Sequence, residues 1–248
     1  MPVIENNFEI RAADGITDAA LCRPEGEGQW PGVLYLTDVG GIRPTTRDQI
    51  RRLATEGYVV LMPNLFYRTA RPPVFEVKPG DAEAFRKRMT ELTAPLTSEK
   101  LERDLSIYVD ALTEDRSCAL GTIGVVGYCF SGGAAVRTAA VRSDAVGAAA
   151  SFHGGRLYTD SPESPHLLLP RIKAQLYFAH AIEDGSMPKE AIEKFNSALA
   201  KWGGKYRSEI YDGAFHGWTM PDTQVYNQPQ AERAFRELLK LFRENLEK

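Results

Sequence analysis

The chain has little of several features that would assign it to a particular class of protein. It holds 3 cysteines among 248 residues, and their odd number and wide spacing predict neither a disulfide framework nor a zinc site. No apolar run approaches the length of a membrane span. The first residues also lack the basic and apolar segments of a signal peptide. We therefore expect a cytoplasmic protein, because a reducing compartment would keep its thiols reduced.

An excess of basic charge is missing too. The formal net charge is −3, and the 30 Lys and Arg residues are scattered, which argues against a nucleic-acid partner. Neither a Gly-x-Gly-x-x-Gly nor a Walker A pattern is present. We expect no metal and no cofactor. The remaining composition, 43% hydrophobic and 25% charged, is that of an ordinary globular protein long enough to bury a core.

Predicted strands and helices alternate along the whole chain, without a linker or a repeat. The apolar runs predict strands at 8–11, 16–23, 33–36, 58–62, 121–128, 145–152, 174–180 and 207–211. Amphipathic or Ala-rich stretches predict helices at 45–56, 81–92, 98–112, 132–141, 188–202 and 232–246. This alternation predicts one α/β domain over residues 1–248, with a mostly parallel sheet covered by helices on both faces. The Pro-rich segments 64–80 and 156–172 are interpreted as loops that shape the mouth of a site.

The run Gly-Tyr-Cys-Phe-Ser-Gly-Gly at 127–133 is the most informative stretch. A buried strand meets a turn of small residues and then a helix, which is the pattern of a nucleophile elbow with Cys129 at its centre. Gly127 and Ser131 are small enough for the close approach of strand and helix, and the helix N-terminus favours a thiolate. Two alternatives stay open. Cys129 could be a small buried hydrophobe, and Ser131 is a rival nucleophile in an overlapping frame.

Polar side chains follow four of the predicted strands, and ligands of parallel sheets bind at the carboxyl ends of strands. These residues are Asp38, Cys129, Asp184 and His216. The order nucleophile, acid, histidine is that of α/β-hydrolases. In such a triad the histidine takes the proton of the nucleophile, and the acid holds the ring in the correct tautomer.

The partners of the nucleophile have competitors. Glu183 and Asp212 compete with Asp184 for the acid, and an Asp-Gly pair before a helix can equally form a turn or a cap. His153 and His180 also lie at strand ends. They are interpreted as packing or pocket-wall residues, although His153 could contact a substrate.

Four segments together resemble the dienelactone hydrolase family of the α/β-hydrolase superfamily, at 57–68, 127–133, 180–184 and 213–222. The resemblance covers nearly the whole chain. It implies an α/β-hydrolase fold without a large cap domain. It also implies hydrolysis of an ester or lactone through a thioester acyl-enzyme, with Cys129 as nucleophile, His216 as base and Asp184 as the acid.

The resemblance further implies an oxyanion hole formed by the backbone N–H groups of Val39 and Phe130. Two positions depart from the family's best-known members. Asp38 stands where they carry a glutamate that holds the resting thiol, and Met220 stands where they carry an arginine that grips the substrate carboxylate. Other candidates for thiol or substrate contacts are Arg68, His153 and Trp218, and Arg43 or Arg86 could also supply a positive clamp.

The sequence thus predicts a hydrolase of a small-molecule ester or lactone, without a nucleic-acid or membrane partner, as a monomer or small homo-oligomer. The departures at Asp38 and Met220 motivate an alternative, a catalytically weak ligand-binding or sensing protein on the same scaffold. Redox cycling is disfavoured because no Cys-x-x-Cys is present.

Overall fold

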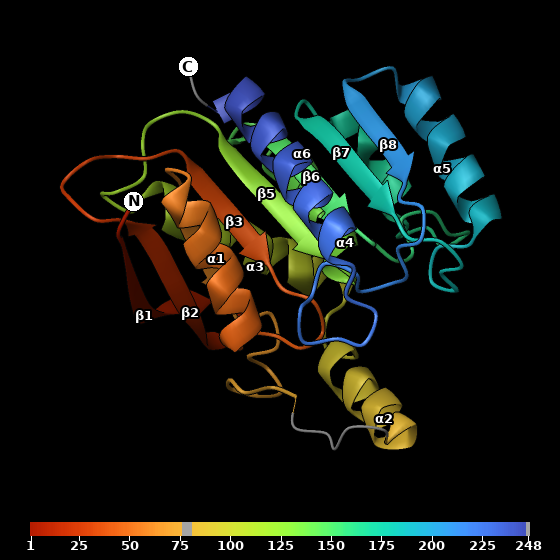
Figure 1. Ribbon diagram of the computed structural model, residues 1–248, viewed down its shortest axis with the longest axis horizontal. Coiled ribbons are helices and arrows are strands. Elements are labelled where there is room, and N and C mark those ends of the chain that lie inside the picture. The colour runs from red at the N-terminus through yellow and green to blue at the C-terminus, as the bar shows by residue number, and fades with distance from the viewer. Residues whose placement is uncertain (76–80, 247–248) are drawn as a thin grey trace. The chain divides into compact units, whose positions relative to one another are not determined.

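A computed structural model describes residues 1–75 and 81–246 and divides the chain into two compact units, Met1–Ala119 and Leu120–Lys248 (Figure 1). The expectation of a single domain stays a prediction. Each unit holds strands and helices in the alternation that the sequence predicts.

The first unit contains a four-stranded arrangement in the order β1-β2-β4-β3. The pairs β1/β2 and β2/β4 are antiparallel, and β3/β4 is parallel. Its elements are β1 (Val3–Ala12), β2 (Gly15–Pro24), β3 (Gly32–Leu36), α1 (Pro44–Thr55), β4 (Val59–Pro63), α2 (Ala82–Thr93) and α3 (Ser98–Thr113).

The burial of these elements follows from their residue patterns. Every residue of β3 and β4 is buried, as their unbroken apolar runs predict for strands covered on both faces. Helix α1 buries Ile50 and Leu53 from one face, and Gly57, with φ 97°, follows its C-cap. Helix α3 begins after the N-cap Thr97, whose side chain accepts a hydrogen bond from the Lys100 N–H.

The second unit is a parallel sheet in the order β5-β6-β7-β8, the green to blue arrows of Figure 1. Helices α4 and α6 cover opposite faces of it. A Cβ added at Gly124 would meet Phe242 of α6, whereas one added at Gly127 would meet the backbone of α4, and residues three apart on a strand point to opposite faces. The elements are β5 (Ile123–Tyr128), α4 (Ser131–Val141), β6 (Val146–Phe152), the 3₁₀ helix η1 (Pro165–Arg171), β7 (Gln175–His180), α5 (Lys189–Trp202), β8 (Tyr206–Ile210) and α6 (Gln228–Leu246).

The observed boundaries lie within a few residues of the predicted ones, with β1 and α6 longer than expected. Pro188 is the N-cap of α5 and not its first residue. The predicted loop at 64–80 has no helix or strand through residue 75, and residues 76–80 lie outside the described part of the chain.

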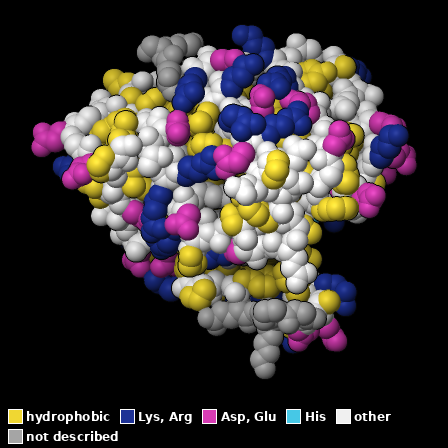
Figure 2. Space-filling model, viewed as in Figure 1, with side chains coloured by type: hydrophobic (Ala, Val, Ile, Leu, Met, Phe, Trp, Pro, Cys, Tyr) yellow, Lys and Arg dark blue, Asp and Glu magenta, His cyan; other side chains and the backbone are white. Residues whose placement is uncertain are grey.

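None of the described helices is long and apolar enough to cross a membrane. On the face shown in Figure 2, basic and acidic side chains lie interspersed.

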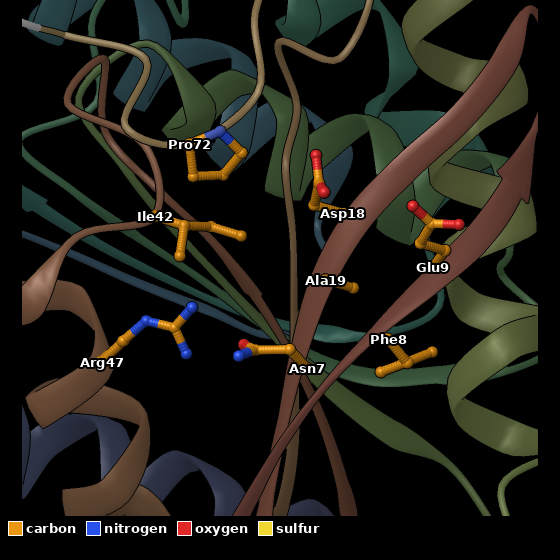
Figure 3. A pocket seen from close by; sticks show the side chains of 8 residues that line it. All are labelled: Asn7, Phe8, Glu9, Asp18, Ala19, Ile42, Arg47 and Pro72. Atoms are coloured by element: carbon orange, nitrogen blue, oxygen red, sulfur yellow. The ribbon is translucent and has the colours of Figure 1, made fainter.

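A hollow of about 320 Å³ lies in the first unit, beside β1, β2 and the start of α1 (Figure 3). Its charged lining residues form ion pairs. Arg47 pairs with Glu5, and Glu9 and Asp18 both pair with Arg71. None of the residues that the sequence predicts for chemistry lines it.

Candidate active site

Cys129 lies in a sharp turn between β5 and α4, with φ 60°, a left-handed conformation that non-glycine residues rarely adopt. The turn is tight. A Cβ on Gly127 would lie 2.1 Å from the Ser131 carbonyl oxygen, and a Cβ on Gly132 would lie 2.3 Å from Ser151 Oγ. Such a conformation costs about 1–3 kcal/mol and persists only where its surroundings enforce it. The small residues of the 127–133 run are therefore a steric requirement of this turn.

His216 links the thiol to a carboxylate. Its Nε2 lies 3.0 Å from Cys129 Sγ, and its Nδ1 lies 2.6 Å from Asp184 Oδ2. These distances suit hydrogen bonds. Because an ionised carboxylate only accepts, Nδ1 carries the proton toward Asp184, and Nε2 faces the sulfur. All three side chains come from the carboxyl ends of strands in the second unit, β5, β7 and β8, which lie at one edge because these strands are parallel.

The electrostatics of His216 and Asp184 are coupled. Burial lowers the pKa of His216, but its hydrogen bonds to Asp184 and Cys129 outweigh burial and raise that pKa to about 10. Burial raises the pKa of Asp184, but the bonds from His216 and Ser186 outweigh it and lower that pKa to about 2. The pair therefore holds a proton on the imidazole and none on the carboxyl at neutral pH.

Of the three carboxylates that compete for His216, Asp184 is the one that the structure brings to the ring. It is 7% exposed, whereas Glu183 and Asp212 are exposed. Asp184 Oδ1 accepts hydrogen bonds from the Ser186 N–H at 2.8 Å and the Ser186 hydroxyl at 2.6 Å. Asp184 is thus both the turn former and the partner of the histidine. Ser186 was not among the predicted site residues, although the Asp-x-Ser spacing at 184–186 is a signal that could have indicated it.

The rival nucleophile Ser131 is fully buried and is occupied by the turn itself. Its hydroxyl accepts from the Tyr128 N–H at 2.8 Å and lies 2.9 Å from the Tyr128 carbonyl oxygen, to which it donates. Cys129, by contrast, is partly exposed. The geometry favours Cys129 as the group that a substrate could reach.

His153 and Trp218, predicted as substrate contacts, lie behind His216. They are 1% and 0% exposed, and their rings meet edge to face at 5.0 Å. The His153 ring centroid lies 5.1 Å from that of His216. Both side chains are buried: Trp218 contributes packing, and His153 contributes packing and hydrogen bonds to the Cys129 N–H and Thr219. Met220 is buried as well.

The remaining predicted residues have partners within the first unit. Both Asp38 carboxylate oxygens accept from Arg43, at 2.5 and 2.9 Å, and Oδ1 also accepts from the Gly40 N–H. Val39 follows Asp38 in this turn and is half-buried. Its pairing with Phe130 of the second unit in an oxyanion hole stays a prediction.

Arg68 is an internal ion-pair residue. It donates to both oxygens of Asp104, at 2.6 and 3.2 Å, and to Asp14 at 2.8 Å, with 9% of its side chain exposed. These partners account for the guanidinium without a substrate, so we do not include Arg68 in the site. In the described ranges, no group of three or more His, Cys, Asp or Glu side chains could hold a metal ion.

Comparison with known proteins defines the class first. The crystal structure named "Putative Dienelactone Hydrolase" from Klebsiella pneumoniae matches with a TM-score of 0.86 at 21% identity, covering 98% of this chain and 99% of that one. The chain therefore has the α/β-hydrolase fold, with a mostly parallel sheet and no large cap domain, as predicted.

The family follows from sequence. The family model described as "Dienelactone hydrolase family" matches residues 17–246, so the chain belongs to this family. It is 29% identical over 209 residues to the carboxymethylenebutenolidase of Rhodococcus opacus, covering 84% of this chain and 77% of that protein. It is 33% identical over 190 residues to the hydrolase tropI of Talaromyces stipitatus, covering 75% and 70%. The predicted enzyme class, a carboxylic ester or lactone hydrolase, is confirmed.

Proposed function

We propose that this enzyme hydrolyses its ester or lactone through a thioester on Cys129, with His216 as proton carrier and Asp184 as the orienting acid. The observation that supports this most directly is the position of His216, which reaches Cys129 Sγ at 3.0 Å and Asp184 at 2.6 Å at the same time.

In the first half-reaction the Cys129 sulfur attacks the carbonyl carbon while its proton resides on His216 Nε2. A carbon–sulfur bond forms and the carbonyl oxygen becomes negatively charged. Collapse of this intermediate breaks the ester carbon–oxygen bond, and His216 Nε2–H protonates the leaving alkoxide. In a lactone the released hydroxyl stays on the same acyl chain.

In the second half-reaction His216 Nε2 takes a proton from water, and the hydroxide attacks the thioester. The carbon–sulfur bond breaks, the acid leaves, and the proton on Nε2 restores the resting pair. Asp184 keeps Nδ1 protonated and stabilises the imidazolium throughout. The backbone N–H group of Phe130 is a proposed donor to the oxyanion.

The substrate we propose is a small ester or lactone without a carboxylate that must be clamped. The name of the Rhodococcus relative indicates an acid-bearing lactone for that protein. Here Met220 is buried, Arg68 is held by Asp104 and Asp14, and Arg43 is paired with Asp38. The remaining clamp candidate, Arg86, is exposed on helix α2. A lactone acid and its methyl ester should therefore show similar kcat/KM; a marked preference for the acid would contradict this part of the proposal.

The decisive experiment compares wild type with Cys129→Ala and Cys129→Ser on p-nitrophenyl acetate and a small lactone panel. Loss of a triad nucleophile reduces kcat by about 10⁴–10⁶-fold, so the alanine variant should fall to the background rate. Undiminished hydrolysis by Cys129→Ala would sink the proposal. Saturable ligand binding without turnover in an intact wild-type protein would favour the ligand-binding alternative.

The two other cysteines are matched controls. Cys22 and Cys118 are buried, and burial raises the pKa of each thiol to about 11. Iodoacetamide should therefore label Cys129 selectively, and Cys22→Ala and Cys118→Ala should retain wild-type kcat.

A further inference from the structure

His153 follows β6 directly, and its side chain is buried against the nucleophile turn. Its ring has two polar neighbours: the Cys129 backbone nitrogen lies 3.1 Å from Nδ1, and Thr219 Oγ1 lies 2.8 Å from Nε2. The ring packs edge to face on Trp218, and the His153 backbone N–H is anchored to the Ala179 carbonyl of β7.

These contacts determine which ring nitrogen is protonated. A backbone N–H can only donate, so Nδ1 must present its lone pair to Cys129. The single proton of a neutral imidazole is then on Nε2, from which it is donated to the Thr219 hydroxyl oxygen. His153 is therefore an acceptor aimed at the backbone of the proposed nucleophile, with its other nitrogen held in place.

The turn at 152–155 forms hydrogen bonds with both the backbone N–H and the backbone carbonyl of Cys129. The Cys129 N–H is shared between His153 Nδ1 and the Phe152 carbonyl at 3.2 Å, and the Cys129 carbonyl accepts from the Gly155 N–H at 3.2 Å. Cys129 needs such support because its φ of 60° is unfavourable for a residue with a Cβ. The conformation of Cys129 sets the direction of Sγ and of the next N–H in the chain, the proposed oxyanion donor of Phe130.

We propose that His153 is a positioning residue that holds the left-handed turn at Cys129 by accepting a hydrogen bond from the Cys129 N–H through Nδ1. The proposal rests on the proposed function, in which Cys129 is the nucleophile. His153 acts through the backbone and touches no substrate.

The surroundings keep this acceptor available. Burial and the neighbouring His216 lower the pKa of His153 well below its ordinary value, although Asp184 raises it. Protonation at Nδ1 would set two N–H groups against each other and place a second positive charge near the His216 imidazolium. The two histidines, only 5.1 Å apart, thus have opposite protonation tendencies and separate tasks.

The test uses two variants at this position. His153→Phe keeps an aromatic ring for Trp218 but removes the acceptor. His153→Asn removes the ring but can place its amide oxygen near the Nδ1 position. We expect His153→Phe to lower kcat about 10²-fold with KM unchanged, since small misplacements of a reacting group have effects of this size. His153→Asn should recover most of the loss.

Stability is measured in parallel, because φ at His153 is 40° and Asn tolerates this region better than Phe. Rates are therefore compared on folded protein, with the melting temperature of each variant known. His180→Gln is the matched control: His180 is also a buried histidine, at the last position of β7, but its Nε2 bonds to Ser208 Oγ, and kcat should stay at the wild-type value.

Two outcomes would overturn the proposal: wild-type kcat in folded His153→Phe, or equal losses in the Phe and Asn variants. The ¹⁵N resonances of the His153 ring supply a readout that does not depend on turnover. They should show the Nε2–H tautomer across about pH 6–9, and a proton on Nδ1 would refute the proposal. If Cys129→Ala retained activity, the proposed function would fail. Two measurements would then still decide whether His153 holds the turn: the ¹⁵N resonances of its ring, and the alkylation rate of Cys129 in His153→Phe.

Discussion

Each unit of the chain contains a partly buried cluster of ionisable groups, and the two clusters differ in which group is exposed to solvent. In the first unit Arg68 lies between Asp14 and Asp104, with 2% of the Asp104 side chain exposed. In the second unit His216 lies between Asp184 and Cys129, with 31% of its side chain exposed. Both are a base flanked by acidic groups, yet they support different functions.

The difference lies in the chemistry of the central residue and in its access to solvent. A guanidinium stays protonated under all working conditions, so Arg68 cannot carry a proton between reacting groups, and its hydrogen bonds go to Asp104 and Asp14. An imidazole can give up its proton and take one back, and a partly exposed sulfur beside it can meet a substrate. Buried charge alone therefore does not mark an active site. What marks it is a group that can lose its proton next to one that can attack.

Of the changes that test this difference between the two clusters, Asp184→Asn should have the largest effect, a loss of kcat. The amide cannot hold the Nδ1–H tautomer of His216, and in comparable triads this change lowers kcat about 10⁴-fold. Steady-state hydrolysis of p-nitrophenyl acetate measures it. The exposed carboxylates Glu183 and Asp212 are controls, and Glu183→Gln and Asp212→Asn should keep wild-type kcat. A loss in either control comparable to that of Asp184→Asn would mean that the acid is misassigned.

Changing Arg68→Met should affect stability. It leaves Asp104 buried without its cation, which lowers the free energy of unfolding by about 3–5 kcal/mol. Urea denaturation measures this loss. The double variant Arg68→Met/Asp104→Leu removes both charges and should recover much of it. If Arg68→Met kept full stability and raised KM for acid-bearing substrates only, Arg68 would instead be a residue that binds the substrate carboxylate.

Changing Ser186→Ala should have a smaller effect, because the Ser186 backbone N–H still supports Asp184. Loss of one side-chain hydrogen bond costs about 1 kcal/mol, which corresponds to roughly a fivefold fall in kcat. The kcat of this variant, set beside that of Asp184→Asn, measures how much of the carboxylate's orientation depends on the hydroxyl. A loss of kcat as large as that of Asp184→Asn would contradict the expectation that the backbone N–H is enough to support Asp184.

The pH dependence of stability should show the smallest effect, since His216 is partly exposed and solvent screens its ion pair. The pKa of His216 is raised to about 10, so its contribution is fully present below about pH 6.5 and is lost as the pH rises through about 10. The pKa of Asp184 is lowered to about 2, so its contribution is lost as the pH falls from about 4 through about 2. Urea midpoints of wild type should therefore decline more steeply than those of Asp184→Asn toward both extremes. Parallel curves would show that the pair does not stabilise the fold.

The secondary structure was predictable because its signals are local. The unbroken apolar runs of β3, β4 and β5 require burial on both faces wherever they lie. The tight turn at Cys129 was predictable for the same reason, since Gly127 and Ser131 are small where the chain must pass close to itself. The order of Cys129, Asp184 and His216 along the chain reflects the order of the strands that carry them.

The choice among neighbouring candidates was not predictable in this way. Glu183 and Asp184 are adjacent carboxylates, and only the path of the backbone after β7 decides which one points to His216. Arg68 and His153 look available in the sequence, because nothing local reveals that Asp104, 36 residues away, and Thr219, 66 residues away, bind their polar atoms. Trp218 also looks available, but its ring is buried and packs on His153.

The sequence by itself determined the α/β alternation and the tight turn at Cys129, because each depends on residue size and hydrophobicity over a short stretch, and it determined the family through a match over residues 17–246. The tertiary structure alone decided which carboxylate orients His216, that Arg68 belongs to a closed ion pair, and that His153 faces the backbone of Cys129. Those outcomes depend on distances and burial between segments far apart in the chain, and hydrogen bonds and pKa values follow from such distances.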